Sequence, residues 1–180
     1  GRVSGCRQGW AYRQGHRHFL PTGQRAEHQD PRPPLLYLRS FADEPGLRNH
    51  EEALARVLSQ FGPFVAIGDP KDTLAHIAAA RDYVPDDAWQ ELVTLRLKRS
   101  QLVVLLAGAT PGLAWEVEQC RKLLDPAKLL VVVPANAAAY EKFARLCEER
   151  GVSLPAFASF EHDRGPIAGL VSFDAHWQPH

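Results

Sequence analysis

The sequence predicts a three-layer α/β domain, doubly wound around a sheet of about five parallel strands with helices on both faces. Two observations predict this class. Short continuous apolar runs recur along the chain, and the segments between them carry apolar residues at helical spacing. The length of 180 residues fits one domain, and a hydrophobic fraction of 45% can supply its core. We expect the domain to span residues 35–180.

Four apolar runs form the expected strands. They lie at residues 35–38, 64–67, 102–106 and 129–133. One of two short apolar pieces near the end, 157–160 or 170–173, is expected to add a fifth strand. Strands that are apolar on both faces are typical of a parallel sheet covered by helices, with right-handed crossover connections.

The expected helices alternate with these strands. Asn49 resembles an N-cap, with Glu52 completing a capping box, and Gly62–Pro63 ends that helix. Further helices are expected at about 87–99, 113–124 and around 140–147. No strand or helix pattern is evident over 69–86, and a connection of that length in a compact domain is usually functional or mobile.

Residues 1–34 form a basic segment that differs from the rest of the chain. Its basic residues include Arg2, Arg7, Arg13, His16, Arg17, His18, Arg25 and Arg32. One interpretation is a solvated arm or a short helix packed on the domain. The other is a juxtamembrane segment on the cytoplasmic side of a span outside this sequence, because basic residues gather on that side. The absence of Met favours a processed chain or a piece cut from a longer chain.

Charge and cysteine content exclude several classes of function. Twenty-one basic residues balance twenty-one acidic ones, which argues against a nucleic-acid footprint over the whole domain. The three cysteines, Cys6, Cys120 and Cys147, lack metal-ligand spacing and cannot all pair within the chain. None of the eight histidines has metal-helix spacing either. We therefore expect no metal site, and a reduced, cytoplasmic compartment in which Cys120 and Cys147 are buried.

Three local patterns occur in the order of a Toll/interleukin-1 receptor (TIR) domain. The first is Tyr37-Leu38-Arg39-Ser40-Phe41, at the end of the first expected strand. The second is Arg81-Asp82-Tyr83-Val84-Pro85-Asp86, before the 87–99 helix. The third is Gly112-Leu113-Ala114-Trp115-Glu116-Val117, after the 102–106 strand. Over about residues 35–160 the chain resembles a bacterial TIR-like domain, which implies a flavodoxin-like sheet.

The resemblance implies an enzyme that cleaves the nicotinamide–ribose bond of NAD, as an effector or signalling module in immunity such as antiphage defence. It places Glu116 at the catalytic position. NAD is then substrate rather than cofactor, and the family's habit of self-association implies a homo-oligomer. The residues expected to contact the substrate lie at the carboxyl ends of the strands, in the 69–86 connection or beside Glu116. They are Arg39, Ser40, Phe41, Gly68, Asp69, Arg81, Gly108 and Trp115.

Helical geometry, without reference to the family, also favours Glu116 over Glu118 as the site residue. At about 100° per residue, Leu113, Val117, Cys120 and Leu124 form one apolar stripe. Glu116 borders this stripe, whereas Glu118 points into solvent. A structural interpretation remains, because a Glu in the first turn of a helix interacts favourably with the helix dipole. Arg39 has a structural alternative too, as a salt-bridge partner of Asp43 or Glu44.

Two other functions stay open. The chain departs from the TIR pattern at Arg39, at Asp86 in place of Gly, and at Gly112 in place of Ser or Cys; these departures favour a non-catalytic interaction and self-assembly domain. A nucleoside deoxyribosyltransferase-like enzyme shares the α/β plan and uses a Glu after a strand end. Phosphate-binding, dinucleotide-binding and nucleophile-elbow glycine motifs are absent from the sequence.

Overall fold

The structure, a computed structural model, describes residues 23–39, 48–68, 80–83, 89–160 and 165–180. Its sheet consists of β1 (Leu35–Leu38), β2 (Phe64–Gly68), β3 (Ala80–Tyr83), β4 (Leu102–Leu106), β5 (Leu129–Pro134) and β6 (Ile167–Val171). Its helices are α2 (Gly23–Gln29), α3 (Arg48–Leu58), α4 (Trp89–Arg99), α5 (Pro111–Leu123) and α6 (Ala137–Glu148), with 3-10 turns η2 (Pro126–Lys128) and η3 (Phe157–Ser159).

The sheet confirms the predicted α/β class. Its order is β3-β2-β1-β4-β5-β6, and the first five strands in this order are parallel. The chain starts in the middle of the sheet at β1, builds outward through β2 and β3, and then crosses to β4, β5 and β6. The order therefore reverses between β1 and β4, which is the topological switch point of the sheet.

Two edge strands differ from the sequence expectations. β3 pairs with β2 inside the connection expected to have no strand, with Val65 opposite Ala80. Its sequence, Ala-Arg-Asp-Tyr, lacks an apolar run because an edge strand is less enclosed than a central one. The last strand is Ile167–Val171, and it runs antiparallel to β5. The other candidate piece folds as the 3-10 turn η3.

The direction of β6 follows from the path of the chain after α6. The amide of Ala135, just past the end of β5, donates to the Pro166 carbonyl, so the chain has returned to the carboxyl end of β5 before β6 begins. A strand that starts at this end must run backward along β5. A right-handed crossover would have made the last strand parallel to β5. Because the chain takes the shorter path, β6 is an antiparallel edge strand.

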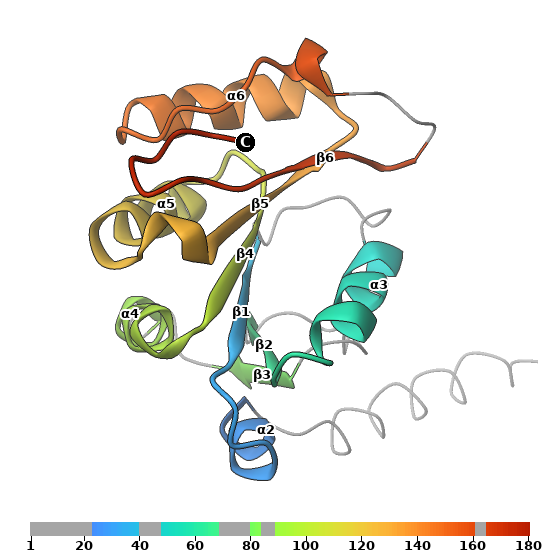
Figure 1. The fold of residues 1–180 in the computed structure, drawn as a ribbon, viewed down its shortest axis with the longest axis vertical. Coiled ribbons are helices and arrows are strands. Elements are labelled where there is room, and N and C mark those ends of the chain that lie inside the picture. Colours follow the sequence, from blue (N-terminus) through green and yellow to red (C-terminus); the bar gives the residue numbers. More distant parts are fainter. Residues whose placement is uncertain (1–22, 40–47, 69–79, 84–88, 161–164) are drawn as a thin grey trace, which may run out of the picture.

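The helices form two layers around the sheet, as Figure 1 shows. α4, α5 and α6 cover one face, where Val93, Leu97, Val117 and Phe143 pack with the inward side chains of β1, β4 and β5. α3 lies on the opposite face, where Ala55 is buried against the sheet. α3 begins at Arg48, so Asn49 lies inside the helix rather than at its N-cap. Cys120 and Cys147 are buried free thiols in the larger cluster, as expected.

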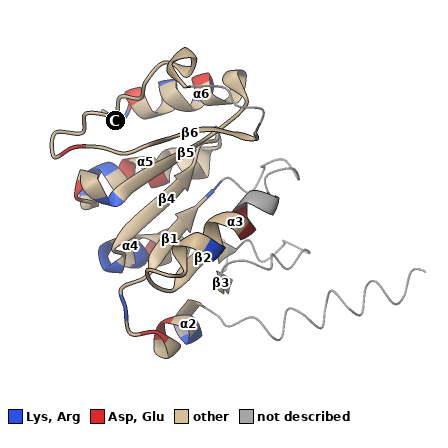
Figure 2. Ribbon diagram, turned by 45° about the vertical axis from the view of Figure 1, so that its right-hand side comes forward, with Lys and Arg blue, Asp and Glu red and all other residues tan. Residues whose placement is uncertain are grey.

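Part of the basic N-terminal segment is attached to the domain. α2 contacts β2 and β3, at the edge of the sheet that β3 forms. Its Glu27 forms an ion pair with the buried Arg96 of α4, and lies 3.3 Å from Nη2 of Arg99. Figure 2 shows the charged residues of α2 beside the basic end of α4. Residues 1–22 lie outside the described part of the chain.

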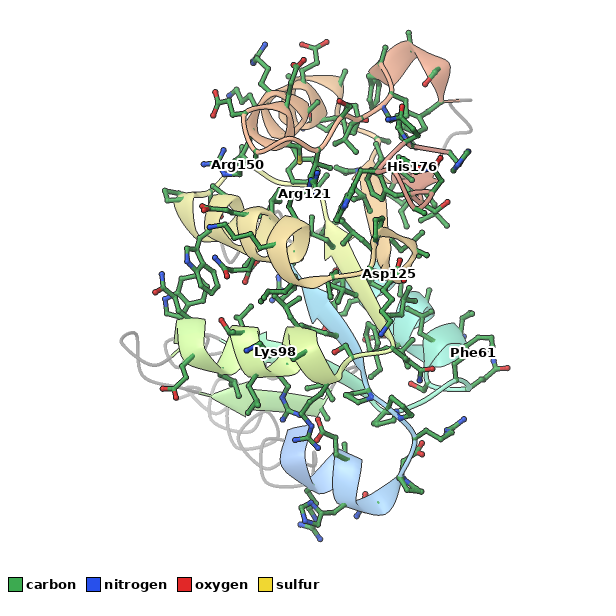
Figure 3. The ribbon with its side chains drawn as sticks, turned by 60° about the vertical axis from the view of Figure 1, so that its left-hand side comes forward. Phe61, Lys98, Arg121, Asp125, Arg150 and His176 are labelled. Atoms are coloured by element: carbon green, nitrogen blue, oxygen red, sulfur yellow. The ribbon has the colours of Figure 1, made fainter. Side chains whose placement is uncertain are left out.

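The C-terminal residues close the face formed by α5 and α6. Phe173 and Trp177 are buried in the larger core cluster, and the Arg121 guanidinium lies over the Trp177 ring, 4.9 Å from its centroid. The Asp174 carboxylate accepts bonds from the amides of His176 and Gln178, which tightens the turn. Arg121 and His176 are labelled in Figure 3. Among the described residues, no helix is both long and apolar enough to cross a membrane.

Candidate functional site

The carboxyl ends of the parallel strands meet at one edge of the sheet. Arg39 follows β1, Gly68 ends β2, and the buried Gly108 lies two residues beyond β4. Because β1 and β4 flank the switch point, Arg39 and Gly108 bracket the position at which open α/β sheets bind ligands. Three of the residues predicted to contact substrate are thus brought to one edge.

The local sequence fixes where α5 begins beside this edge. The Thr110 hydroxyl accepts a hydrogen bond from the Leu113 amide, and Pro111 occupies the first helical position. Glu116 is therefore the sixth residue of the helix and lies in its second turn. No acidic residue occupies the first turn. The structural interpretation of Glu116 as a partner of the helix dipole is wrong, because that interaction is confined to the first turn.

Glu116 is buried, with 7% of its surface exposed. Burial alone raises the pKa of its carboxyl to about 8. Among the described residues, neither a hydrogen bond nor a salt bridge reaches this carboxyl. Glu118, two residues on, is partly exposed and pairs with Lys122. This agrees with the expectation that Glu118 points into solvent. A buried acid without a compensating partner is destabilising, and such groups gather at functional sites.

The neighbours of Glu116 on α5 lie toward α4. The Trp115 ring meets the Trp89 ring edge to face, with centroids 4.9 Å apart and an interplanar angle of 73°. Trp89 is the first residue of α4, and its Cη2 lies 3.9 Å from the position that a Cβ on Gly112 would take. Both tryptophans are half-buried. The side of α5 that carries Gly112 and Trp115 therefore faces the start of α4.

Arg39 forms a salt bridge with an acidic residue that sequence reasoning did not select. Its Nε lies 3.6 Å from Oε2 of Glu51, and both side chains are largely buried. Glu51 belongs to α3, thirteen residues beyond the end of β1. Asp43 and Glu44, the expected partners, lie outside the described residues. The Arg39 guanidinium is held against α3, on the opposite side of the sheet from Glu116.

The remaining predicted site residues are only partly located. Ser40, Phe41 and Asp69 lie outside the described residues. Arg81 lies in β3 opposite Ala66, and the structure describes its backbone but not its side chain. Near α5, the structure therefore describes the surroundings of three predicted site residues: Gly108, Trp115 and Glu116. In the described ranges, no cluster of three or more His, Cys, Asp or Glu residues could hold a metal ion.

Two residues of this region were missed from the sequence. Trp89 was expected only as a core residue of the 87–99 helix, and Glu51 carried no signal beyond its place in an amphipathic helix. Each makes its contact with a residue outside its own helix, which local sequence patterns do not reveal. The family-model, curated-protein and solved-structure comparisons found no match to the chain.

Proposed function

We propose that the chain is a TIR-like enzyme that cleaves the nicotinamide–ribose bond of NAD, with Glu116 as the catalytic residue. The observation that carries the proposal is the buried Glu116 carboxyl, which has no compensating partner among the described residues and lies on a helix that starts at the carboxyl edge beside the switch point. Retaining such a group lowers stability, which is the usual sign of a functional requirement.

The reaction requires one negative charge near the ribose. The bond between the ribose C1′ and the ring nitrogen breaks, and its electron pair leaves with nicotinamide, which becomes neutral. The ribose develops oxocarbenium character and then takes the oxygen of a water molecule, which loses a proton. A carboxylate near the ribose stabilises this positive charge, most strongly where water is excluded. The products are nicotinamide, ADP-ribose and a proton.

Glu116→Gln tests this proposal. The amide keeps the shape of the side chain but cannot carry the negative charge, so we expect the rate of NAD consumption to fall by about 100-fold or more. The measurement is nicotinamide release by the purified chain across a wide range of protein concentration, because TIR-like domains act as assemblies.

The matched control is Glu118→Gln, which changes a carboxylate on the solvent side of the same helix and should leave the rate unchanged. Equal rates for the wild type and the Glu116 variant would remove Glu116 from the site. Base exchange on deoxynucleosides without NAD turnover would favour the deoxyribosyltransferase-like alternative. Assembly at high concentration without either activity would favour an interaction domain.

A further inference from the structure

Three helices end at the edge of the sheet where the parallel strands begin. α3 leads into β2, α4 into β4, and α5 through η2 into β5, so their C-terminal turns gather at this amino edge. Hydrogen bonds join the segments that precede the strands. The side-chain amide of Gln101, just before β4, donates to the carbonyls of Pro33 and Phe61, which precede β1 and β2. The amino edge lies opposite the carboxyl edge at which α5 begins.

Exposed apolar side chains concentrate at the amino edge. Among the described residues, five large hydrophobic side chains are exposed, and four of them lie in the C-terminal part of a helix or just past it. These four are Val57, Phe61, Leu95 and Leu123. Phe61 lies at the periphery of the molecule in Figure 3. Large apolar side chains that gather in one exposed region mark an interaction surface.

Positive charge accompanies these apolar side chains. The exposed cations of the same helix ends and connections are Arg32, Arg56, Lys98, Arg99, Lys122 and Lys128. Figure 2 shows basic residues at the ends of α4 and α5 on the same side of the molecule. On α4, Lys98 and Arg99 follow Leu95 by three and four positions, so the three side chains share one side of the helix.

Acidic groups neutralise only part of this charge. Arg32 pairs with Asp30, and Lys122 pairs with Glu118. The single carboxylate of Glu27 serves both Arg99 and the buried Arg96. In the part of the chain that the structure describes, the exposed cations outside any ion pair include Arg56, Lys98 and Lys128. Even with the nearby Asp125, whose carboxylate caps η2, the amino edge carries an excess of positive charge.

The helix dipole explains the cations but not their apolar neighbours. Lys and Arg are favourable in the last turn of a helix, because that end carries a partial negative charge. The dipole gives no reason to leave Phe61 and Leu95 in water, where large apolar side chains are least stable. A surface that combines exposed apolar side chains with Lys and Arg is typical of proteins that lie on anionic membranes.

We propose that the amino-edge surface, formed by Arg56, Phe61, Leu95, Lys98, Arg99 and Lys128, docks on an anionic lipid bilayer. The cations contact the charged headgroups, and the apolar side chains enter the layer beneath them. A second copy docked through the same surface about a two-fold axis would bring like charges together. A nucleic acid would attract the cations through its phosphates, but it would leave Leu95 without an apolar partner.

Docking of this surface orients the domain on the membrane. The carboxyl ends of the parallel strands, with Gly108 and the start of α5, face away from the bilayer into water. β1 begins at the docked edge, so the chain enters the domain beside the membrane. The lipid contact does not involve Glu116, so it stands or fails independently of the proposed cleavage of NAD.

Co-sedimentation of the full chain with vesicles tests the charge of this surface. We expect binding to vesicles of phosphatidylcholine mixed with phosphatidylserine, and binding at least about tenfold weaker to phosphatidylcholine alone or at high salt. Lys98→Gln should weaken binding about fivefold, and addition of Arg56→Gln should bring the loss above about tenfold. Lys142→Gln removes an exposed cation from the middle of α6 and is the matched control; it should leave binding unchanged.

The apolar part of the surface has its own test. Leu95→Ser should weaken vesicle binding, whereas Leu170→Ser should not, although the two side chains are equally exposed at 50% and 52%. Tryptophan introduced by Phe61→Trp should be quenched by lipids with brominated acyl chains, relative to the wild type. Tryptophan introduced by Leu170→Trp is the control and should not be quenched.

Three results would overturn the proposal. Vesicle binding that persists in the Arg56 and Lys98 double variant, without quenching at position 61, would assign the lipid contact to another segment. Self-association lost in Leu95→Ser, without vesicle binding, would favour a second copy as the occupant. Binding to DNA that depends on Lys98 but not on Leu95, without vesicle binding, would favour a nucleic acid.

Discussion

At Glu116, burial changes the proton affinity of a single side chain enough to affect the stability of the whole fold. An unfolded chain ionises this carboxyl near its ordinary pKa of 4.5, and the folded chain near 8. Between these values the folded state holds a proton that the unfolded state has lost. The free energy of unfolding therefore falls as pH rises from about 4.5 to about 8, and this contribution is fully retained only below 4.5.

Glu116→Gln removes this pH dependence. We expect the variant to be more stable than the wild type by about 3 kcal/mol at pH 7, and equally stable near pH 4. Urea unfolding at pH 4, 7 and 8.5 measures the difference. Glu118→Gln is the control and should show no gain, since the Lys122 partner lowers the pKa of Glu118. A Glu116 variant less stable than the wild type at pH 7 would mean that the carboxylate has a favourable partner.

At the scale of elements, α2 shows how a segment with a weak sequence signal becomes part of the fold. Its seven residues are too few to form a stable helix alone. Glu27 anchors it through the buried Arg96 and the partly exposed Arg99, both at the C-terminal end of α4. Burial lowers the pKa of Arg96, because it disfavours the charged guanidinium. The Glu27 carboxylate beside it offsets part of this cost.

Glu27→Gln should destabilise the chain because it removes the negative charge that faces the buried Arg96. We expect the free energy of unfolding to fall by about 2 to 3 kcal/mol. Salt should reduce this loss only by the part that comes from the exposed Arg99, because the buried Arg96 pair is hardly screened. Thermal or urea unfolding gives the value, and far-ultraviolet circular dichroism shows whether the rest of the fold persists. Lys122→Gln, which breaks an exposed pair with Glu118, is the comparison and should cost below about 1 kcal/mol. Equal losses for the two variants would contradict a buried anchor.

At the scale of the whole molecule, one core joins α4, α5 and α6 to the sheet, and two cysteines report on it. Cys120 and Cys147 are buried in this core, on neighbouring helices. Burial raises the pKa of the Cys147 thiol to about 12, and that of Cys120 also lies above its usual value because of burial. Neither thiol can form a reactive thiolate until the core opens.

Thiol labelling therefore measures opening of the core. In a Cys6→Ser background, we expect both remaining thiols to react with an aromatic disulfide reagent at least about a thousandfold more slowly than a free thiol. Both should become reactive together in denaturant, with the same midpoint as the loss of helical signal. Rapid labelling of one thiol in native buffer would show that α5 or α6 opens separately from the sheet.

Local patterns allowed much of this fold to be predicted, because each depends on residues that are neighbours in sequence. The four apolar runs became β1, β2, β4 and β5, and helical spacing correctly separated the buried Glu116 from the exposed Glu118. The exact helix start beyond Thr110 was missed by two residues. With the later start, Glu116 was expected in the first turn of the helix, where it would interact with the helix dipole. It lies in the second turn instead.

The sequence by itself determined the parallel α/β class, the four core strands and the side of α5 on which Glu116 lies, since apolar runs and helical periodicity are local properties. Only the tertiary structure decided that β3 and the antiparallel β6 complete the sheet, that Arg39 pairs with Glu51, and that Trp89 comes to rest against Trp115 and beside Gly112. Edge strands lack a strong apolar pattern, and contacts between separate elements depend on how the layers pack. For that reason the surroundings of Glu116 could be described only once α4, α5 and the sheet were placed together.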